Sequence, residues 1–327
     1  MKSNIYKQIA GILPGALLVL PLAASAADTW PSRPIRMIAP FPAGSSVDAA
    51  IRVIAPRVAE ALGQSIVIDN RAGAGGTIGA DLASKATPDG YNISAGTTST
   101  HALPKALGTR VAYDAQKDFM PITLFGHLPY IMAVHPAVQA KTVAELVALA
   151  KAKPGNIRYT TVGNSSMARL GGELLSTLAG IQMTPVVYKS SAQSVIDTIA
   201  GRIELQFGTM APVLPHVRAG RLRALAVTGG ERSPALPNVP TAAEAGYKDL
   251  EVTLWMGAFA PAGTAPAYVD RLNREFVNVI NQPAVRKMLI HQGLQPQSTT
   301  PAQFGDLIAQ AITRWREVAR RANLKPG

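Results

Sequence analysis

The sequence predicts an α/β protein made of two lobes with a cleft between them. Short apolar runs of strand length alternate with segments whose apolar residues recur every three or four positions, the spacing of one helix face. Alternating strands and helices imply mostly parallel sheets flanked by helices. Two apolar segments, residues 122–134 and 252–260, are predicted to be strands that cross between two sets of such units. Paired crossings are typical of hinged lobes that close around a cleft.

We expect residues 28–128 and 251–327 to form the first lobe and residues 129–250 to form the second. The first lobe should contain strands at 35–39, 65–68 and 91–95 and helices at 47–62 and 78–85. The second should contain strands at 157–161, 184–188, 203–207 and 222–227 and helices at 142–151, 170–178 and 195–200. Two helices close the chain. One carries Val269, and the other starts at residue 300. Capping boxes at 142–145, 241–244 and 300–303 support this assignment.

The first residues have the layout of a secretory signal peptide. Two lysines precede a mainly apolar stretch at residues 9–22, and small residues follow at 24–27. We therefore expect residues 1–27 to be a signal peptide, cleaved near Ala26 or Ala27, and the mature protein to be exported. No later stretch approaches the length of an apolar spanning helix.

Composition narrows the function classes. The 327 residues are enough for two domains, and the absence of cysteine excludes disulfides, thiolate-bound zinc and a cysteine nucleophile. The net charge of +12 suits nucleic acid, an anionic surface or an anionic ligand. Because aromatic residues are only 6% and the lysines and arginines are spread along the chain, a solvated basic surface is favoured over nucleic-acid binding.

The loop at residues 40–48 connects the first predicted strand to the first predicted helix. Ser45 or Ser46 can cap that helix, whose start presents unpaired backbone N–H groups and the positive end of the helix dipole. Such an end suits an anion, and Gly44 permits close backbone approach. An ordinary strand-to-helix turn has the same features, so this loop alone does not define a site.

Four more polar loops follow predicted strands, at residues 96–101, 162–167, 189–193 and 208–209. Ligands of open α/β sheets bind at such strand ends. Backbone N–H groups and hydroxyls bind a carboxylate through hydrogen bonds and dipoles, without a buried formal charge. Five such loops at matching positions predict a carboxylate-binding cleft.

Catalytic patterns are scarce in this sequence. The five histidines are isolated, no G-x-S-x-G elbow occurs, and the glycines at 73–79 lack the third glycine of a dinucleotide fingerprint. Asp48, in a first helical turn, is expected to be a dipole partner or a cap rather than a catalytic residue. His101 is the best acid–base candidate, yet a hydrogen-bonding or structural role is expected for it. We therefore predict no catalytic residue, no metal site and no cofactor.

Several motifs resemble those of one family along the whole mature chain. They are WPSRPIR at 30–36, PFPAG at 40–44, NRAGAGG at 70–76, PDGY at 88–91, RAGRLRALAVT at 218–228 and SPALPNVPT at 233–241. These resemble the Bug family, the TctC-like periplasmic receptors of tripartite tricarboxylate transporters. The resemblance implies a type II periplasmic-binding-protein fold that closes on a small carboxylate and delivers it to membrane permease subunits. We expect a monomer in the periplasm.

The resemblance also implies which residues bind the ligand. Two turns of the first lobe should hold its carboxylate, one after the first strand and one at a Thr-x-x-Thr-His loop, and three loops of the second lobe should complete the site. The implied ligand-binding residues are Phe41, Ala43, Gly44, Ser45, Ser46, Thr97, Thr98, Ser99, His101, Val162, Gly163, Asn164, Ser165, Ser166, Arg169, Tyr188, Lys189, Ser190, Ser191, Gly208 and Thr209.

Four departures from the family pattern bear on the ligand. Ala-Gly-Ser at 43–45 replaces Pro-Gly-Gly, and Thr-Ser at 98–99 replaces Asn-Gly. Arg169 replaces a common histidine and offers a bidentate anion contact. Gly208 replaces an acid that would pair with an ammonium group. We therefore expect a di- or tricarboxylate or an aromatic carboxylate rather than an amino acid.

Three function classes remain after this step. The first is a receptor that delivers a carboxylate to a permease or acts as an orphan sensor. The second is an enzyme on a related two-lobed fold, which would turn over its bound carboxylate; the missing acid–base pairs oppose it. The third is a basic nucleic-acid binder, which needs a clustered basic face with stacking aromatics, and the sequence shows neither.

Overall fold

The computed structural model describes residue 1, residues 30–163 and residues 166–321. Apart from Met1, the predicted signal peptide lies outside the described residues, as does its cleavage site. The described part of Pro31–Gly327 belongs to one compact unit. The lobe boundaries after residues 128 and 250 therefore stay a prediction.

Strands and helices alternate along the described chain. The strands are β1 (Ile35–Ala39), β2 (Ile66–Asn70), β3 (Asn92–Thr97), β4 (Phe119–Val134), β5 (Arg158–Thr161), β6 (Thr184–Val187), β7 (Leu205–Thr209), β8 (Arg223–Val227), β9 (Thr253–Pro261) and β10 (Gln295–Pro296). The helices are α1 (Ser46–Leu62), the 3-10 turn η1 (Ala74–Gly76), α2 (Thr77–Ser84), α3 (Thr98–His101), α4 (Leu103–Leu107), α5 (Val143–Ala152), α6 (Met167–Ala179), α7 (Ser191–Ile199), α8 (Leu214–Arg218), α9 (Pro266–Ile280), α10 (Pro283–His291) and α11 (Pro301–Arg321).

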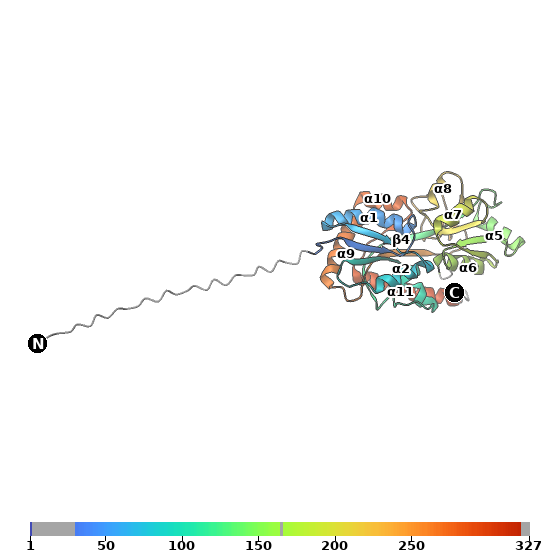
Figure 1. Ribbon diagram of the computed structural model, residues 1–327. Helices are drawn as coiled ribbons and strands as arrows, with labels where there is room; N and C mark the ends of the chain where they lie inside the picture. The colour runs from blue at the N-terminus through green and yellow to red at the C-terminus, as the bar shows by residue number, and fades with distance from the viewer. Residues whose placement is uncertain (2–29, 164–165, 322–327) are drawn as a thin grey trace. The chain divides into compact units, whose positions relative to one another are not determined.

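The strands pair in the order β2-β1-β3-β9-β4-β7-β5-β6, and β8 and β10 also pair with β4. β1 is parallel to β2 and β3, and β5 is parallel to β6 and β7, as expected for strand–helix units. β9 is antiparallel to β3 and β4, and β4 is also antiparallel to β7 and β8. The α/β prediction is confirmed, and the sheet is mixed because the two crossing strands run against the parallel units. Helices α1 and α10 lie on one side of the sheet and α2 and α11 on the other (Figure 1).

Strand β4 changes partner along its length. It pairs with β9 as far as Pro129, and from Tyr130 onward it pairs with β7 and then β8. Thr228, which is fully buried, supplies hydrogen-bond partners where the strands separate. Its Oγ1 accepts from Tyr130 N at 2.9 Å and donates to Val252 O at 2.5 Å. We call this point, where β4 leaves β9, the fork.

Two of the three predicted capping boxes form completely, at 241–244 and 300–303, and the second of these begins α11. At 142–145, which begins α5, Thr142 Oγ1 accepts from Glu145 N, but the Glu145 carboxylate accepts from Lys141 N instead of Thr142 N. In the box at 241–244, the Glu244 carboxylate accepts from Thr241 N at 2.7 Å and the Glu244 N–H donates to Thr241 Oγ1 at 3.1 Å. This segment stays a turn because it runs into Gly246, whose φ of +95° is not helical.

An aromatic cluster packs between β9 and α11. The Phe304 ring lies 5.0 Å from that of Phe259 and 5.2 Å from that of Trp255. Gly257 lies between these two strand residues, and a Cβ added there would collide with the Phe304 ring and with the Thr123 carbonyl oxygen of β4. The missing side chain thus lets β9, β4 and α11 approach one another. None of the described helices is both long and apolar enough to cross a membrane.

Replacing Gly257 by alanine should lower the free energy of unfolding by about 1–3 kcal/mol, because one of the colliding groups is backbone and cannot rotate away. Urea unfolding of the two proteins measures the difference. Gly230→Ala is the matched control, since a Cβ there meets no atom within 4 Å, and its stability should stay within about 0.5 kcal/mol of the parent. Equal stability of both variants would contradict this account of the packing.

Candidate functional site

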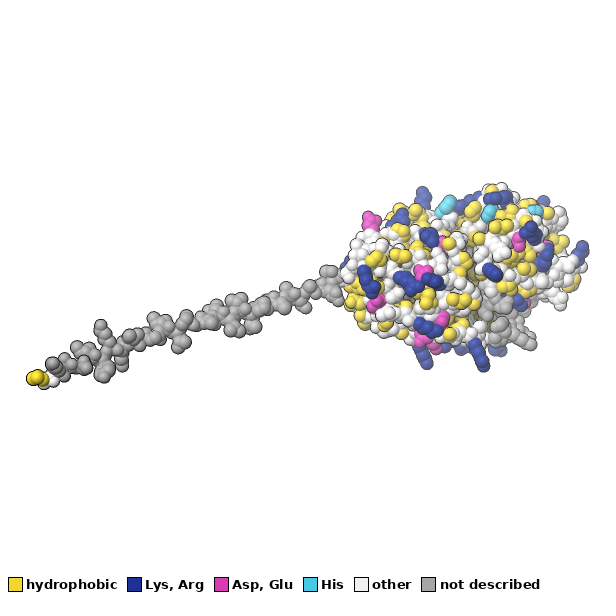
Figure 2. All heavy atoms as spheres, viewed as in Figure 1, with side chains coloured by type: hydrophobic (Ala, Val, Ile, Leu, Met, Phe, Trp, Pro, Cys, Tyr) yellow, Lys and Arg dark blue, Asp and Glu magenta, His cyan; other side chains and the backbone are white. Residues whose placement is uncertain are grey.

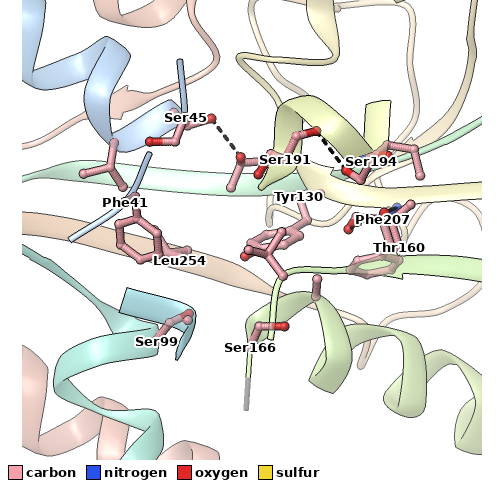
Figure 3. A pocket seen from close by; sticks show the side chains of 18 residues that line it. Phe41, Ser45, Ser99, Tyr130, Thr160, Ser166, Ser191, Ser194, Phe207 and Leu254 are labelled. Carbon is pink, nitrogen blue, oxygen red and sulfur yellow. Dashed lines mark hydrogen bonds between the residues drawn. The ribbon is translucent and has the colours of Figure 1, made fainter. Parts of the chain in front are cut away.

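A cavity opens at the fork (Figure 3). Tyr130 of β4 and Leu254 of β9 both line it. The other lining residues come from β5, β7 and α7 and from the segments that follow β1, β2, β3 and β5. Ligands of α/β sheets bind at the carboxyl ends of strands where the strand order changes. This cavity, which we call the central cavity, is therefore the candidate site.

Three helices of eight or more residues, α1, α6 and α7, have serine N-caps at this cavity or beside it. The hydroxyls of Ser45, Ser166 and Ser190 each accept a hydrogen bond from the backbone N–H three residues later, at 3.2–3.3 Å. Ser45 and Ser166 line the central cavity, and α7 contributes Ser191 and Ser194 to its wall. Helix N-termini carry positive partial charge, so their convergence favours an anion.

One hydrogen bond connects two segments that are distant in sequence across the central cavity. Ser46 Oγ, at the start of α1, donates to Thr209 Oγ1, at the end of β7, over 2.8 Å. Both residues line the cavity. The bond brings the loop after β1 into direct contact with β7, the strand with which β4 pairs beyond the fork.

Asp48 holds the loop after β1 in place. Its carboxylate accepts hydrogen bonds from Gly44 N at 2.9 Å, Arg52 Nε at 2.8 Å and Asn70 Nδ2 at 3.0 Å. Asn70 Nδ2 also donates to Phe41 O at 3.0 Å. Burial alone would raise the pKa of Asp48, but these hydrogen bonds and the Arg52 charge outweigh burial and hold the pKa below its ordinary value. Asp48 thus remains ionised and positions the residues that line the cavity.

The central cavity has a neutral wall. None of the described residues that line it is a lysine, arginine, histidine, aspartate or glutamate. Tyr130 and Phe207 contribute rings with centroids 5.9 Å apart, and burial raises the pKa of the Tyr130 phenol, which therefore stays protonated. Among the described residues, no group of three His, Cys, Asp or Glu side chains could hold a metal.

Gln206 places an amide beside Gly208. Its Oε1 accepts a hydrogen bond from Thr198 Oγ1 at 3.1 Å, so the amide nitrogen of Gln206 points away from Thr198. A Cβ added at Gly208 would lie 2.7 Å from that nitrogen, Nε2. Both residues line the central cavity. A side chain at position 208 would therefore displace a neutral hydrogen-bond donor from the wall.

A second, outer cavity shares Phe41, Gly75 and Val162 with the central one. Lys189 is the one charged side chain among its described lining residues. A Cβ added at Gly163 would lie 3.4 Å from Gly75 Cα, so the two loops approach closely beside this cavity because neither carries a side chain there.

The structure brings many of the sequence-predicted residues together. Those that line the central cavity are Phe41, Ser45, Ser46, Ser99, Val162, Ser166, Ser191, Gly208 and Thr209. Those that line the outer cavity without lining the central one are Gly163, Tyr188, Lys189 and Ser190. Asn164 and Ser165 lie outside the described residues. The others, Ala43, Gly44, Thr97, Thr98, His101 and Arg169, are not among the lining residues of either cavity. For all of them, ligand contact stays a prediction.

His101 and its neighbours are buried behind the loop after β3. The His101 ring stacks on Phe259 with centroids 4.0 Å apart, and its Nδ1 shares a hydrogen bond of 2.8 Å with Thr100 Oγ1. Burial lowers the pKa of His101 to about 3, so the ring is neutral at physiological pH. Thr98 Oγ1 accepts a hydrogen bond from Trp255 N at 3.0 Å. These side chains fix the loop to β9.

Arg169 forms an ion pair within its own helix. Its Nε lies 2.8 Å from Glu173 Oε1, one turn further along α6. Glu173 also accepts a hydrogen bond from Tyr159 at 3.1 Å. A contact between Arg169 and an anion would therefore compete with Glu173.

Several lining residues were not predicted from the sequence. They are Val47, Gly75, Tyr130, Thr160, Ala168, Ser194, Gln206, Phe207 and Leu254. Tyr130 and Leu254 lie in the two segments predicted to cross between lobes. Because such segments pass beside a cleft between lobes, their position in the sequence could have indicated these two residues. Ser194 lies three residues after Ser191 in a helix and therefore faces the same way. That spacing could also have indicated Ser194 as a lining residue.

Comparison with known proteins identifies the family. Residues 50–324 match the family described as "Tripartite tricarboxylate transporter family receptor" (TctC). Protein BugT of Bordetella pertussis is 36% identical over 307 residues, covering 93% of each chain. Rpa4515 of R. palustris, solved with adipate, is 33% identical with a TM-score of 0.88, covering 91% of this chain and 100% of that chain. MatC (Rpa3494) of Rhodopseudomonas palustris, solved with bound malate, is 29% identical with a TM-score of 0.81, covering 88% and 99%.

The chain therefore belongs to the TctC family of tripartite tricarboxylate transporter receptors, which are periplasmic solute-binding proteins. The Bug-family resemblance and the periplasmic-binding-protein fold predicted from the sequence are confirmed.

Replacing Asp48 by asparagine should lower the free energy of unfolding at neutral pH by about 2–3 kcal/mol, because a buried charge-assisted network loses its anion. The pKa of Asp48 is depressed in the folded protein, so its stabilisation is complete above the ordinary carboxyl pKa near 4 and disappears as the pH falls through the lowered value. Denaturant unfolding from pH 7 down to pH 3 should show the two proteins converging in stability.

Asp270→Asn is the control, because Asp270 is exposed on α9. It should change stability by less than about 0.5 kcal/mol at any of these pH values. A difference between parent and D48N that stays constant down to pH 3 would contradict the assigned role of the carboxylate.

Proposed function

We propose that this protein is a periplasmic receptor that binds a small carboxylate without an amino group in the central cavity and delivers it to the membrane subunits of a tripartite tricarboxylate transporter. One observation carries the proposal: helix N-termini and serine and threonine hydroxyls converge on a cavity whose described wall is uncharged. The solved relatives with adipate and malate support a carboxylate ligand.

A carboxylate suits this wall for electrostatic reasons. Hydroxyl and amide donors form charge-assisted hydrogen bonds to an anion, and each helix end adds about 0.3–1 kcal/mol of favourable dipole interaction. No buried cation has to be desolvated to bind the ligand, and none has to be left unpaired when the ligand leaves. Both binding and release are therefore possible without a large barrier, as a delivery protein requires.

An amino acid suits the cavity poorly. An ammonium group would need a carboxylate partner, and the described lining residues include none. Gly208 and the Gln206 amide occupy the position where the family often has an acid. Lys189, in the outer cavity, can receive a second carboxylate of a longer ligand. A di- or tricarboxylate, or an aromatic carboxylate, therefore fits best.

Closure of two lobes on the ligand follows from the same proposal. Residues 28–128 and 251–327 form one lobe and residues 129–250 the other, with β4 and β9 as the connecting strands. Ser46 and Thr209, which form a hydrogen bond, then belong to opposite lobes. Residues 1–27 direct export and are removed near Ala26 or Ala27, and the mature receptor acts as a monomer.

Thermal unfolding of the mature protein with a panel of di- and tricarboxylates, aromatic acids and amino acids tests the proposal. A ligand at about 100 times its dissociation constant should add about 2.7 kcal/mol of stability, a clear rise in melting temperature. We expect this rise with non-amino carboxylates, and chromatography should recover the bound ligand unchanged. Stabilisation confined to amino acids, or conversion of the ligand, would contradict the proposal.

Replacing Gly208 by aspartate should weaken binding of the best carboxylate of this panel by more than about tenfold, which is about 1.4 kcal/mol. The new carboxylate repels the ligand and its Cβ displaces the Gln206 amide. Gly208→Asn is the control, because it has the same shape without the charge. Calorimetric titration should find binding weaker for the aspartate variant than for the asparagine variant; equal losses would mean that charge at this position does not select the ligand.

A further inference from the structure

A third cavity lies on the surface, away from the central one, and we call it the basic groove. It has a volume of about 750 Å³ and is lined by residues of α1 and α10 and by segments near residues 218 and 234. Four basic side chains line it: Arg57, Arg218, Lys287 and His291. No described lining residue is an aspartate or glutamate. The groove therefore concentrates positive charge at one place.

The two arginines and the lysine of the groove are not neutralised within the described chain. None of Arg57, Arg218 and Lys287 forms an ion pair among the described residues. Arg57 Nη1 donates to Val53 O at 2.8 Å, and Arg218 Nη1 lies 3.1 Å from His291 Nε2. By contrast, many other arginines of this protein have carboxylate partners.

A single compact anion is a poor occupant of the basic groove. Arg218 and His291 lie in the last turns of α8 and α10, where the helix end carries negative partial charge and repels an anion placed directly on it. Arg57 and Lys287 lie further back along α1 and α10. The positive charge is thus spread over several elements, which suits carboxylates distributed along a chain.

The basic groove also has an apolar lining. Val53 is buried in its wall, and Met288 is 43% exposed although it is a large apolar side chain. Exposed apolar surface rimmed by charge is typical of a site that binds another protein. The exposed Pro234 and the half-buried Ala235 continue this surface beyond α10.

We propose that the basic groove docks an acidic, partly apolar segment of a protein partner, which on the function proposed above is a membrane subunit of the transporter. Carboxylates of the segment pair with the basic side chains, and apolar side chains between them contact Val53 and Met288. The groove is built from both proposed lobes, so one docked segment contacts both. The net charge, +12 for the full chain and +10 without Lys2 and Lys7 of residues 1–27, accelerates the encounter with an acidic partner. Figure 2 shows lysine and arginine spread over the visible face among fewer acidic side chains.

Fluorescence anisotropy with a short labelled peptide of alternating glutamate and leucine tests this proposal on the mature protein. The variant reverses three charges of the groove, Arg57→Glu, Arg218→Glu and Lys287→Glu. The control reverses three exposed lysines near α5, Lys141→Glu, Lys151→Glu and Lys153→Glu, and has the same net charge. We expect the groove variant to bind the peptide at least about tenfold more weakly and the control to change by less than about threefold.

Several results would overturn the proposal. Equal losses in both variants would mean that only overall charge attracts the peptide, and equal binding of a lysine–leucine peptide would mean that the acidic groups are not recognised. Competition by sulfate at constant ionic strength would indicate a small-anion site. If the triple variant does not fold, Lys287→Glu alone, at an exposed position, replaces it. The receptor function is tested separately, by the stabilisation that carboxylates give in thermal unfolding. That result does not depend on whether the peptide binds.

Discussion

Every buried backbone polar group needs a partner, and at the fork two strands separate inside the protein. Thr228 meets this constraint. Its hydroxyl accepts from Tyr130 and donates to Val252, and its own backbone N–H and C=O pair with Tyr130 O and Val252 N at 2.9 and 3.1 Å. With these groups paired, β4 can leave β9 and join β7 while the backbone N–H and C=O groups of Tyr130 and Val252 keep hydrogen-bond partners. The space between the diverging strands becomes the central cavity.

The loops that surround this cavity are held from behind by side chains that do not line it. Asp48 and Asn70 hold the loop after β1, and His101 and Thr98 fix the loop after β3 against β9. A ligand-binding surface made of hydroxyls and backbone N–H groups needs such support, because its selectivity depends on donors that stay in position. The charged side chain among these four, Asp48, is kept out of the wall, which stays neutral.

Local patterns in the sequence predicted most of the fold and much of the candidate site. Helix periodicity is a short-range signal, so α1, α6 and α7 could be predicted from the sequence, and Ser45 was one of the two caps predicted for α1. Helices α6 and α7 begin three and four residues earlier than predicted, at Met167 and Ser191, with caps that were not predicted. The position of His101 could not be predicted, because its burial depends on Phe259, which is far away in the chain. Arg169 shows a signal that could have been used: Glu173 follows it by four residues, the spacing of a helical ion pair. At Thr241 the local signal was correct, but the chain beyond it did not continue as a helix.

Among the described residues, every charged side chain lies outside the wall of the central cavity. A positive surface attracts anions over a distance of about 10 Å at moderate salt, whatever their structure. The central cavity can then discriminate between anions by their shape and by the positions of its hydroxyls. A buried cation would bind every anion alike, and the described lining residues include none. A lysine or arginine in the wall would add affinity for all carboxylates and slow their release. Keeping attraction on the surface and recognition in the cavity therefore allows a receptor to be both fast and selective.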